Sequence, residues 1–349
     1  MENYEPDQDR PMPWTSTIRC IFCLNERPLG KMSSEHVFPE AIGGTYCIES
    51  VCKVCNDKLG HSVDHFLTDH RLIQFERTRL GLVGKKGVVP NPFGLSHLAG
   101  DESLKFQFRA NKAGRLEPWL VPSVKTREGE NGAKEVAIAI DTRDKDKIPE
   151  MINKILTRAG REERSEQQIW DMVKVQEHTN PEIKSNIPID TIHFKRAMIK
   201  IVYEMACTWL GETYTRDGMA STLRHCMWDK KLNGDWSAQY PIRGQLGAFN
   251  KSAPLLPFLA DRPNQHIVLL SRAQGRIGAY VRIFEVFDGM VEVTKNADQY
   301  PSFIPQFLAI DPVSGRCDKS TVDEEIARLA ISMGGLVWGP TGENGHLGS

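Results

Sequence analysis

Residues 20–23 read Cys-Ile-Phe-Cys and residues 52–56 read Cys-Lys-Val-Cys-Asn, and these two stretches decide the fold of the first part of the chain. A Cys-x2-Cys pair forms a tight turn that places two thiolates on one ion. Two such pairs complete a tetrahedral zinc site with Zn–S distances of about 2.3 Å. We therefore predict one structural zinc ion, bound by the paired cysteines Cys20, Cys23, Cys52 and Cys55.

Five of the eight cysteines lie between residues 20 and 55, so their distribution favours a metal site over a disulfide framework. The alternative is a redox Cys-x2-Cys pair, but one pair would suffice for that and no βαβ pattern surrounds either. Cys47 is expected to be a small buried residue, although it could replace one ligand. The isolated Cys207, Cys226 and Cys317 are expected in the core.

The 28 residues between the pairs (24 to 51) exceed the usual zinc-ribbon spacing, so they should contain folded structure. Residues 34–44 read Ser-Glu-His-Val-Phe-Pro-Glu-Ala-Ile-Gly-Gly. With the Cys-x2-Cys-Asn stretch, this segment resembles the HNH endonucleases, whose catalytic unit is a ββα-metal motif often held by a four-cysteine zinc site. Gly60 and Asp64 fit a bacterial subgroup. The resemblance covers about residues 20–67.

The resemblance implies that His36 is the general base and that Glu35 and Asn56 are ligands of a catalytic divalent metal. A histidine with a pKa near ~6.5 can take a proton from water at neutral pH. Hard cations such as Mg²⁺ or Mn²⁺ prefer oxygen ligands and keep several waters, so two protein oxygens suffice. Adjacent residues on a strand face opposite sides, so one can reach the metal while the other reaches the water.

The segment departs from the family pattern in two ways. Glu35 stands where many members carry Asp, and Glu is one methylene longer. The middle Asn is not evident, and its place falls near residues 47–50, where Thr45, Tyr46 or Glu49 could substitute. The last position is Asn56 rather than His, a known variant. These departures leave metal preference and catalytic rate open.

His61, Asp64 and His65 follow on one expected helix, where His61 and His65 are i, i+4 partners. They could hold a metal, with His61 as a further ligand, or form a polar face that orients the metal ligands. The next segment is basic, with twelve basic and six acidic residues between 71 and 134. Clustered cations bind phosphates, so DNA contacts are predicted at Arg77, Arg79, Lys85 and Lys86, with a solvated surface as the alternative.

The 349 residues suggest about two domains at ~150 residues each, and the 40% apolar and 26% charged composition is ordinary for a globular protein. We predict an α+β fold: a small N-terminal ββα-metal module held by zinc, then a larger mixed α+β domain with antiparallel strands. The expected divisions are a flexible N-terminus (1–17), the HNH module (18–86), the second domain (87–338) and a flexible tail (339–349).

Local patterns place elements in the second domain. Strands are expected at 104–108, 119–122 and 136–140, then at 266–270, 278–287 and 291–293, with Asp288-Gly289 as a hairpin turn. Helices are expected from Ile148 to Gly160 and over the apolar stripe 198–210. On the second helix, the other faces carry Lys195, Arg196 and Lys200, which are expected to face solvent, although they could touch a nucleic-acid backbone. Thr321 to Glu324 matches a capping box for a helix that ends at Gly334-Gly335.

The favoured function is a metal-dependent DNA endonuclease that hydrolyses phosphodiester bonds in restriction or defence against foreign DNA. The second domain would recognise the target DNA or regulate the nuclease, and its ligand would be a small molecule or a modified base. Core packing or a base pocket is open for Trp228, Trp236, Tyr240 and Phe249. One alternative is a zinc-stabilised nucleic-acid-binding module with an inactive nuclease site. Another is an enzyme gated by a ligand of the second domain.

Charge and hydropathy limit the remaining options. The net charge is −1, from 44 basic and 45 acidic residues, so any nucleic-acid surface must be local. No apolar run approaches ~18 residues, so no membrane span or membrane partner is expected. The N-terminal residues lack a basic start and an apolar stretch, and a cytoplasmic protein is expected. A homodimer is open, because cutting both strands often needs two active sites.

Overall fold

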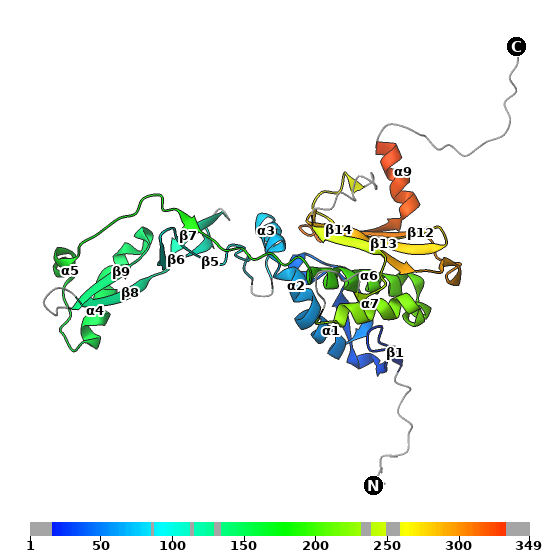
Figure 1. Ribbon diagram of the computed structural model, residues 1–349, viewed down its shortest axis with the longest axis horizontal. Helices are drawn as coiled ribbons and strands as arrows, with labels where there is room; N and C mark the ends of the chain where they lie inside the picture. The colour runs from blue at the N-terminus through cyan, green and yellow to red at the C-terminus, as the bar shows by residue number, and fades with distance from the viewer. Residues whose placement is uncertain are drawn as a thin grey trace, which may run out of the picture. The chain divides into compact units, whose positions relative to one another are not determined.

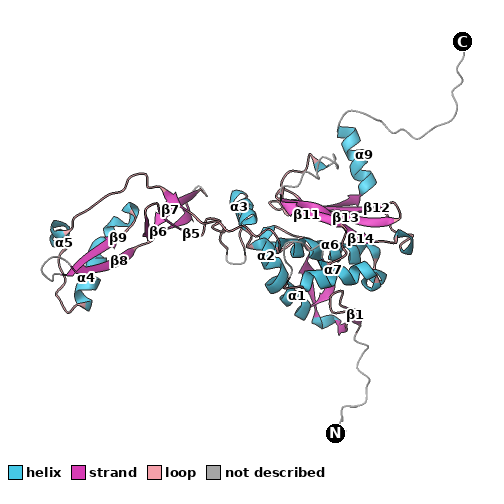
Figure 2. Cartoon of the chain, in the orientation of Figure 1, coloured by secondary structure: helices cyan, strands magenta, loops and turns pink. Residues whose placement is uncertain are grey.

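The computed structural model describes residues 16–84, 87–111, 115–128, 134–231, 239–248 and 259–332 (Figure 1). The chain divides into two compact units, one of Met1–Val88 with Ile189–Ser349 and one of Val89–Pro188. The expected division into 18–86 and 87–338 differs from this, because the segment after residue 188 packs with the first 88 residues. The predicted mixture of helices and antiparallel sheets is confirmed (Figure 2).

The segment that carries the four paired cysteines, residues 17–79, is called the zinc module here. It consists of two small hairpins followed by short helices. Its strands pair antiparallel, β1 with β2 and β3 with β4. In the β3–β4 register, Met32 lies opposite Cys52 and His36 lies opposite Cys47. A bulge in β4 opposite Ser33 and Glu35 accommodates one extra residue. The elements are β1 Thr17–Arg19, β2 Glu26–Pro28, a 3₁₀ turn Leu29–Lys31, β3 Met32–His36, a 3₁₀ turn Glu40–Ile42, and β4 Cys47–Cys52.

A chain of helical segments begins directly after Cys52, which completes the ββα order expected from the sequence. Its segments are α1 Lys53–Leu59, a π-helix Gly60–Asp64, α2 His65–Thr68 and α3 Arg71–Arg79. The π-helix is a rare conformation that is frequent at functional sites. His70 caps α3, because its Nδ1 accepts a hydrogen bond from the backbone N–H of Leu72.

A six-stranded antiparallel sheet forms the centre of the same unit, in the order β11-β14-β13-β12-β15-β16. Alternating residues place Val268 and Leu270 in the large core with α6, and Ile267 and Leu269 in a small core with α9 on the opposite face (Figure 1). The strands are β11 Gly244–Ala248, β12 His266–Ala273, β13 Arg276–Ile283, β14 Phe287–Thr294, β15 Gln306–Ile310 and β16 Cys317–Thr321.

The helices of this sheet region are α6 Phe194–Leu210, α7 Gly218–Trp228 and α9 Val322–Ser332, with 3₁₀ turns at Glu212–Arg216 and Ala297–Gln299. The apolar stripe of α6 is confirmed as core, but the expectation that Arg196 and Lys200 face solvent is wrong. Both are buried because the protein supplies partners: Arg196 Nε donates to the carbonyl of Met227 at 2.6 Å, and Lys200 meets carboxylates described below.

The expected hairpin turn at Asp288-Gly289 is also wrong. Both residues lie inside β14, and the turn from β13 falls on residues 284–286, where Phe284 adopts a φ of 52°. Gly289 is required there because a Cβ atom would come within 1.9 Å of the carbonyl of Gln245 on β11. The capping box of α9 is confirmed, since Thr321 and Glu324 exchange both hydrogen bonds. Its predicted end at Gly334 lies outside the described residues.

The second unit holds a four-stranded sheet in the order β10-β5-β6-β7 and a separate β8–β9 hairpin. The expected helix from Ile148 is confirmed, with Pro149 in its first turn. The elements are β5 Leu95–Leu98, β6 Asp101–Ala110, β7 Leu116–Leu120, β8 Ser123–Glu128, β9 Lys134–Ala139, a 3₁₀ turn Thr142–Lys147, α4 Ile148–Arg158, α5 Glu166–Met172 and β10 Ile183–Lys184.

None of the helices in the described residues combines the length and the hydropathy that crossing a bilayer requires.

Candidate functional site

The four paired cysteines come together at one point of the zinc module. Their sulfur atoms all lie within 4.8 Å of one another, and Cys23 Sγ lies 3.9 Å from Cys52 Sγ. Thiolates around a tetrahedral zinc ion with ~2.3 Å bonds are about 3.8 Å apart, so the set fits one zinc ion. The first pair lies in the turn between β1 and β2, and the second spans the junction of β4 and α1. Cys47 is not a member of this cluster.

The local hydrogen bonds favour a thiolate at one member of this cluster, Cys20. The backbone N–H of Cys52 points at Cys20 Sγ at 3.4 Å. The pKa of Cys20 is lowered to about 4, chiefly because the thiol of Cys55 donates a hydrogen bond to its sulfur. That same bond raises the pKa of Cys55. Four closely placed cysteines, one of which already favours the thiolate that binds metal, have the donor set of a structural zinc site.

Helix α6 holds the first cysteine turn in place. The hydroxyl of Tyr203 donates to the backbone carbonyl of Ile21, between the paired cysteines, and accepts a bond from Arg224 Nη1 at 2.8 Å. Phe22 packs its ring against Tyr203 with 5.2 Å between centroids. The turn of the first pair is therefore fixed by a helix more than 170 residues away in the sequence.

The predicted general base and the residue before it lie at the end of β3 and face opposite sides. His36 is half-buried and pairs with Cys47 across the hairpin, whereas Glu35 is only 3% exposed. The alternation expected for a strand is therefore present. Glu35 shares its face with Ser33, and Asn56 Nδ2 on α1 donates to Ser33 Oγ at 2.8 Å.

Asn56 is fixed by its amide nitrogen alone. Besides the bond to Ser33, Nδ2 donates to the carbonyl of Ser34 at 3.1 Å. These bonds use the amide N–H groups and not Oδ1, the atom type that coordinates hard cations. Carboxylate and amide oxygens are the ligand types that Mg²⁺ and Mn²⁺ prefer, so the residue types of Glu35 and Asn56 suit such an ion.

A buried ion-pair cluster lies directly behind Glu35. Lys200 Nζ of α6 is 2.5 Å from Glu35 Oε1, 3.5 Å from Asp64 Oδ1 and 3.4 Å from Glu204 Oε2. The same ammonium donates to the carbonyls of His36 at 2.7 Å and Val37 at 3.3 Å. Lys200 therefore contacts the strand of the predicted base, the π-helix and its own helix at once.

Burial determines the protonation tendencies in this cluster. It raises the pKa of Glu35 and raises the pKa of Glu204 well above its usual range, and nearby Lys200 only partly offsets this. Burial also disfavours a charged lysine. The carboxylates of Asp64, Glu204 and Glu35 together outweigh that penalty, so the pKa of Lys200 is raised and it stays an ammonium.

The expected polar face of His61, Asp64 and His65 is divided in the structure. Asp64 turns inward to Lys200, His61 is exposed with Nδ1 2.8 Å from the carbonyl of Asp57, and His65 packs on the ring of Phe66. Among the described residues, the four cysteines are the only group of three or more His, Cys, Asp or Glu whose ligand atoms lie within 4.8 Å. Asp64 and Glu35 thus share one partner, Lys200, which is the arrangement expected of a residue that orients a metal ligand.

The predicted DNA-contacting arginines of α3 are engaged within the protein. Arg77 is 6% exposed and Nη1 donates to the carbonyl of Thr68 at 3.4 Å. Arg79, half exposed, pairs with Glu76 and donates to Asn264. Lys85 and Lys86 lie outside the described residues.

The aromatic residues considered for a base pocket pack within the protein where they are described. Trp228 lies under Lys58, whose Nζ is 4.1 Å from the ring centroid, and the Tyr240 hydroxyl donates to Asp229 at 2.9 Å. Trp236 and Phe249 lie outside the described residues.

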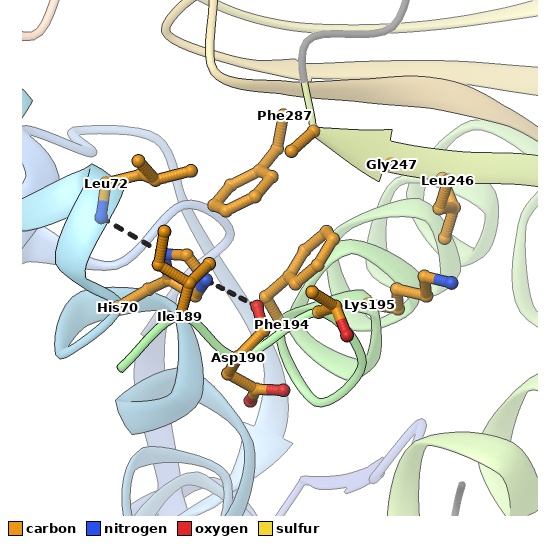
Figure 3. A pocket seen from close by; sticks show the side chains of 11 residues that line it. His70, Leu72, Ile189, Asp190, Phe194, Lys195, Leu246, Gly247 and Phe287 are labelled. Atoms are coloured by element: carbon orange, nitrogen blue, oxygen red, sulfur yellow. Dashed lines mark hydrogen bonds between the residues drawn. The ribbon is translucent and has the colours of Figure 1, made fainter. Parts of the chain in front are cut away.

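A cavity of about 150 Å³ lies between α3, α6 and β14 (Figure 3). Phe194, Phe287 and Leu72 form apolar walls, and the polar residues of the lining are His70, Asp190, Thr191 and Lys195. Both nitrogens of His70 are used, Nδ1 by Leu72 N–H and Nε2 at 2.6 Å from the carbonyl of Asp190. Burial lowers the pKa of His70, so it is a neutral structural group.

Comparison with known families identifies the module. Residues 20–72 match the family model described as HNH endonuclease. The matched range contains both cysteine pairs, Glu35, His36 and Asn56, so the resemblance expected from these motifs is confirmed. Neither a curated protein nor a solved structure matches the chain.

Proposed function

We propose that this protein is a metal-dependent HNH endonuclease that hydrolyses phosphodiester bonds in DNA, with a role in restriction or defence against foreign DNA. One observation supports the proposal: residues 20–72 match the HNH endonuclease family model and fold as a ββα unit, with the four cysteines clustered, Glu35 and His36 on β3, and Asn56 on α1 bonded to Ser33 of β3.

Each residue of the site has a chemical role in the proposal. His36 accepts a proton from the attacking water. Glu35, through an oxygen not bonded to Lys200, and Asn56, through Oδ1, would hold Mg²⁺ or Mn²⁺. When bound, that ion would stabilise the charge on the scissile phosphate. The zinc cluster fixes the geometry, since Cys52 ends β4 and Cys55 lies one residue before Asn56.

The direct test is plasmid cleavage by the full-length protein with Mg²⁺ or Mn²⁺. We expect cleavage that EDTA stops, and a loss of ~10²–10⁴-fold in rate for His36→Ala, the range for one general base. His225→Ala is the control, because His225 is an exposed histidine on α7 with no role in the proposed site and should retain activity. Wild-type rates in His36→Ala would reject the assignment.

A zinc-stabilised DNA-binding module with an inactive site is the second candidate. It is favoured by the pairing of Glu35 with Lys200, which occupies one of the two carboxylate oxygens. It predicts DNA binding without cleavage in any metal, on modified and unmodified DNA alike. Cleavage of modified DNA only would instead support a recognition role for the remainder of the chain. Sedimentation with and without DNA tests whether the protein forms a homodimer, which the sequence leaves open.

A further inference from the structure

Lys200 lies outside the segment that matches the family but contacts its most important strand. The match ends at residue 72, whereas Lys200 is on α6 and is fully buried. Its ammonium has 2.5 Å and 2.7 Å contacts to Glu35 Oε1 and to the carbonyl of His36. These two residues are the proposed metal ligand and the proposed general base.

The contacts of Lys200 restrict both residues in a defined way. An ammonium has three N–H donors, and here they are directed at one carboxylate oxygen and two consecutive backbone carbonyls, those of His36 and Val37. The carbonyl contacts fix the peptide planes on the C-terminal side of His36. The carboxylate contact fixes the rotamer of Glu35 and leaves Oε2 as the oxygen that could bind a metal.

The surroundings of Lys200 have the character of a built site. Glu204, one turn further along α6, is fully buried, and neither of its carboxylate oxygens has a hydrogen-bond partner within the described residues. Glu204 Oε2 and Asp64 Oδ1 both lie within 3.5 Å of the ammonium. Simple packing of α6 on the module would not require a buried lysine with three carboxyl neighbours, because apolar residues would fill that space at lower desolvation cost.

We propose that Lys200 is a positioning residue of the nuclease site, which orients Glu35 for a divalent metal and fixes the backbone that carries His36. This inference rests on the proposed function. Partners of this kind around metal ligands typically affect metal affinity or activity by 10–100-fold. Lys200 would have this effect from α6, a helix that the family model does not include. The proposed nuclease site therefore needs residues outside the matched segment.

The test compares Lys200→Met with Lys200→Arg, which keeps the charge, and with Lys195→Met as the control on the same helix. Removal of one partner from a buried ion pair is destabilising. The double variant Lys200→Met/Glu204→Gln is therefore included, since it removes one of the carboxylates that the first change leaves unpaired. Zinc content and thermal unfolding identify variants that fold.

The readouts are Mn²⁺ affinity, measured by electron paramagnetic resonance of free Mn²⁺, and the kcat and KM for plasmid cleavage. In folded, zinc-loaded Lys200→Met or its double variant we expect Mn²⁺ affinity and kcat to fall about 10–100-fold. KM for DNA should change less than about threefold, and Lys200→Arg should recover part of the loss. The variant Glu35→Gln should lose the Mn²⁺ ion of this site, so its comparison with the wild type distinguishes that ion from Mn²⁺ bound elsewhere.

The outcomes separate the two proposals. Unchanged Mn²⁺ affinity and kcat in a folded Lys200 variant overturn the positioning role while cleavage by the wild type stands. A wild-type protein that binds Mn²⁺ through Glu35 but never cuts overturns the endonuclease, and the Mn²⁺ affinities still decide the role of Lys200. The positioning role of Lys200 is also overturned by a loss confined to KM, by a loss of zinc in every Lys200 variant, or by a wild type that binds no Mn²⁺.

Discussion

Nε2 of His266 lies 2.8 Å from the backbone carbonyl of Ile42, and this bond joins the first residue of β12 to the turn that follows the predicted base. The same ring accepts a bond from the N–H of Phe284 at Nδ1 and stacks on Phe38 with 5.2 Å between centroids. His266 is fully buried and its pKa is lowered, so the six-stranded sheet and the β3–β4 hairpin meet at a neutral imidazole.

Because of His266, the free energy of unfolding should therefore decrease as the pH falls. Burial is the main cause that lowers its pKa to about 4, and nearby Arg282 adds to the effect. Below pH 6.5 the unfolded chain takes up a proton that the folded protein does not bind, so unfolding becomes more favourable as pH falls. We expect a loss of about 3 kcal/mol between pH 6.5 and 4 in the free energy of unfolding, measured with urea.

The variant His266→Gln isolates this contribution. Gln keeps an N–H donor for Ile42 but cannot titrate. It should be less stable than the wild type at pH 7.5 by about 1–3 kcal/mol, because Phe284 N–H loses its acceptor. The gap should narrow toward pH 4. An equal acid sensitivity in both proteins would show that other groups control the transition.

Cys55→Ser should release the zinc ion. Serine is a poor zinc ligand, and loss of one thiolate from a closed four-cysteine site removes binding energy that also stabilises the fold. We expect zinc content to fall well below one per chain, with a clearly lower melting temperature. Cys47→Ser is the control, because Cys47 lies outside the cluster although it is between the pairs. Zinc loss in that variant would mean that Cys47 is a ligand.

Gly44→Ala should destabilise the hairpin turn. A Cβ atom at Gly44 would lie 1.8 Å from the carbonyl oxygen of Phe38, so the backbone would have to move. We expect a cost of about 2 kcal/mol or more in urea unfolding. Gly30→Ala is the matched change, since nothing lies within 4 Å of a Cβ at Gly30. It should be near neutral, and equal costs for the two would contradict the steric argument.

Tyr203→Phe should speed the release of zinc to a chelator. The change removes the hydroxyl that bonds to Ile21 and Arg224, at a cost of about 1–3 kcal/mol. Tyr214→Phe removes an equally buried hydroxyl that bonds to the carbonyl of Val293, away from the cysteines. Similar losses of stability, with faster zinc release only in Tyr203→Phe, are the expected pattern. Release at the same rate in both would show that α6 does not support the cysteine turn.

The zinc module could be predicted because its signals are local. The spacing of the cysteine pairs and the Glu35-His36 motif are contained within about 50 residues, and metal chemistry restricts what such a spacing can be. The same is true of the Thr321–Glu324 capping box, whose two hydrogen bonds span three residues.

The burial of Lys200 could not be predicted, because its partners come from β3 and the π-helix, far away in the sequence. On a helix pattern alone, a lysine belongs to the solvent face. The role of Gly289 was hidden for a related reason. Asp-Gly is a strong hairpin signal, but the close approach of β11 decides the conformation here, and that strand is more than 40 residues earlier.

Helix α6 follows the whole second unit, which is inserted after residue 88. During synthesis the cysteines and His36 leave the ribosome long before Lys200 and Tyr203 exist. A nascent or truncated chain that ends before residue 200 therefore carries the reactive motif without the groups that orient it. Under the proposed function, such a chain would lack the lysine that contacts Glu35 and the tyrosine that holds the first cysteine turn, so the site would be complete only after α6 is made.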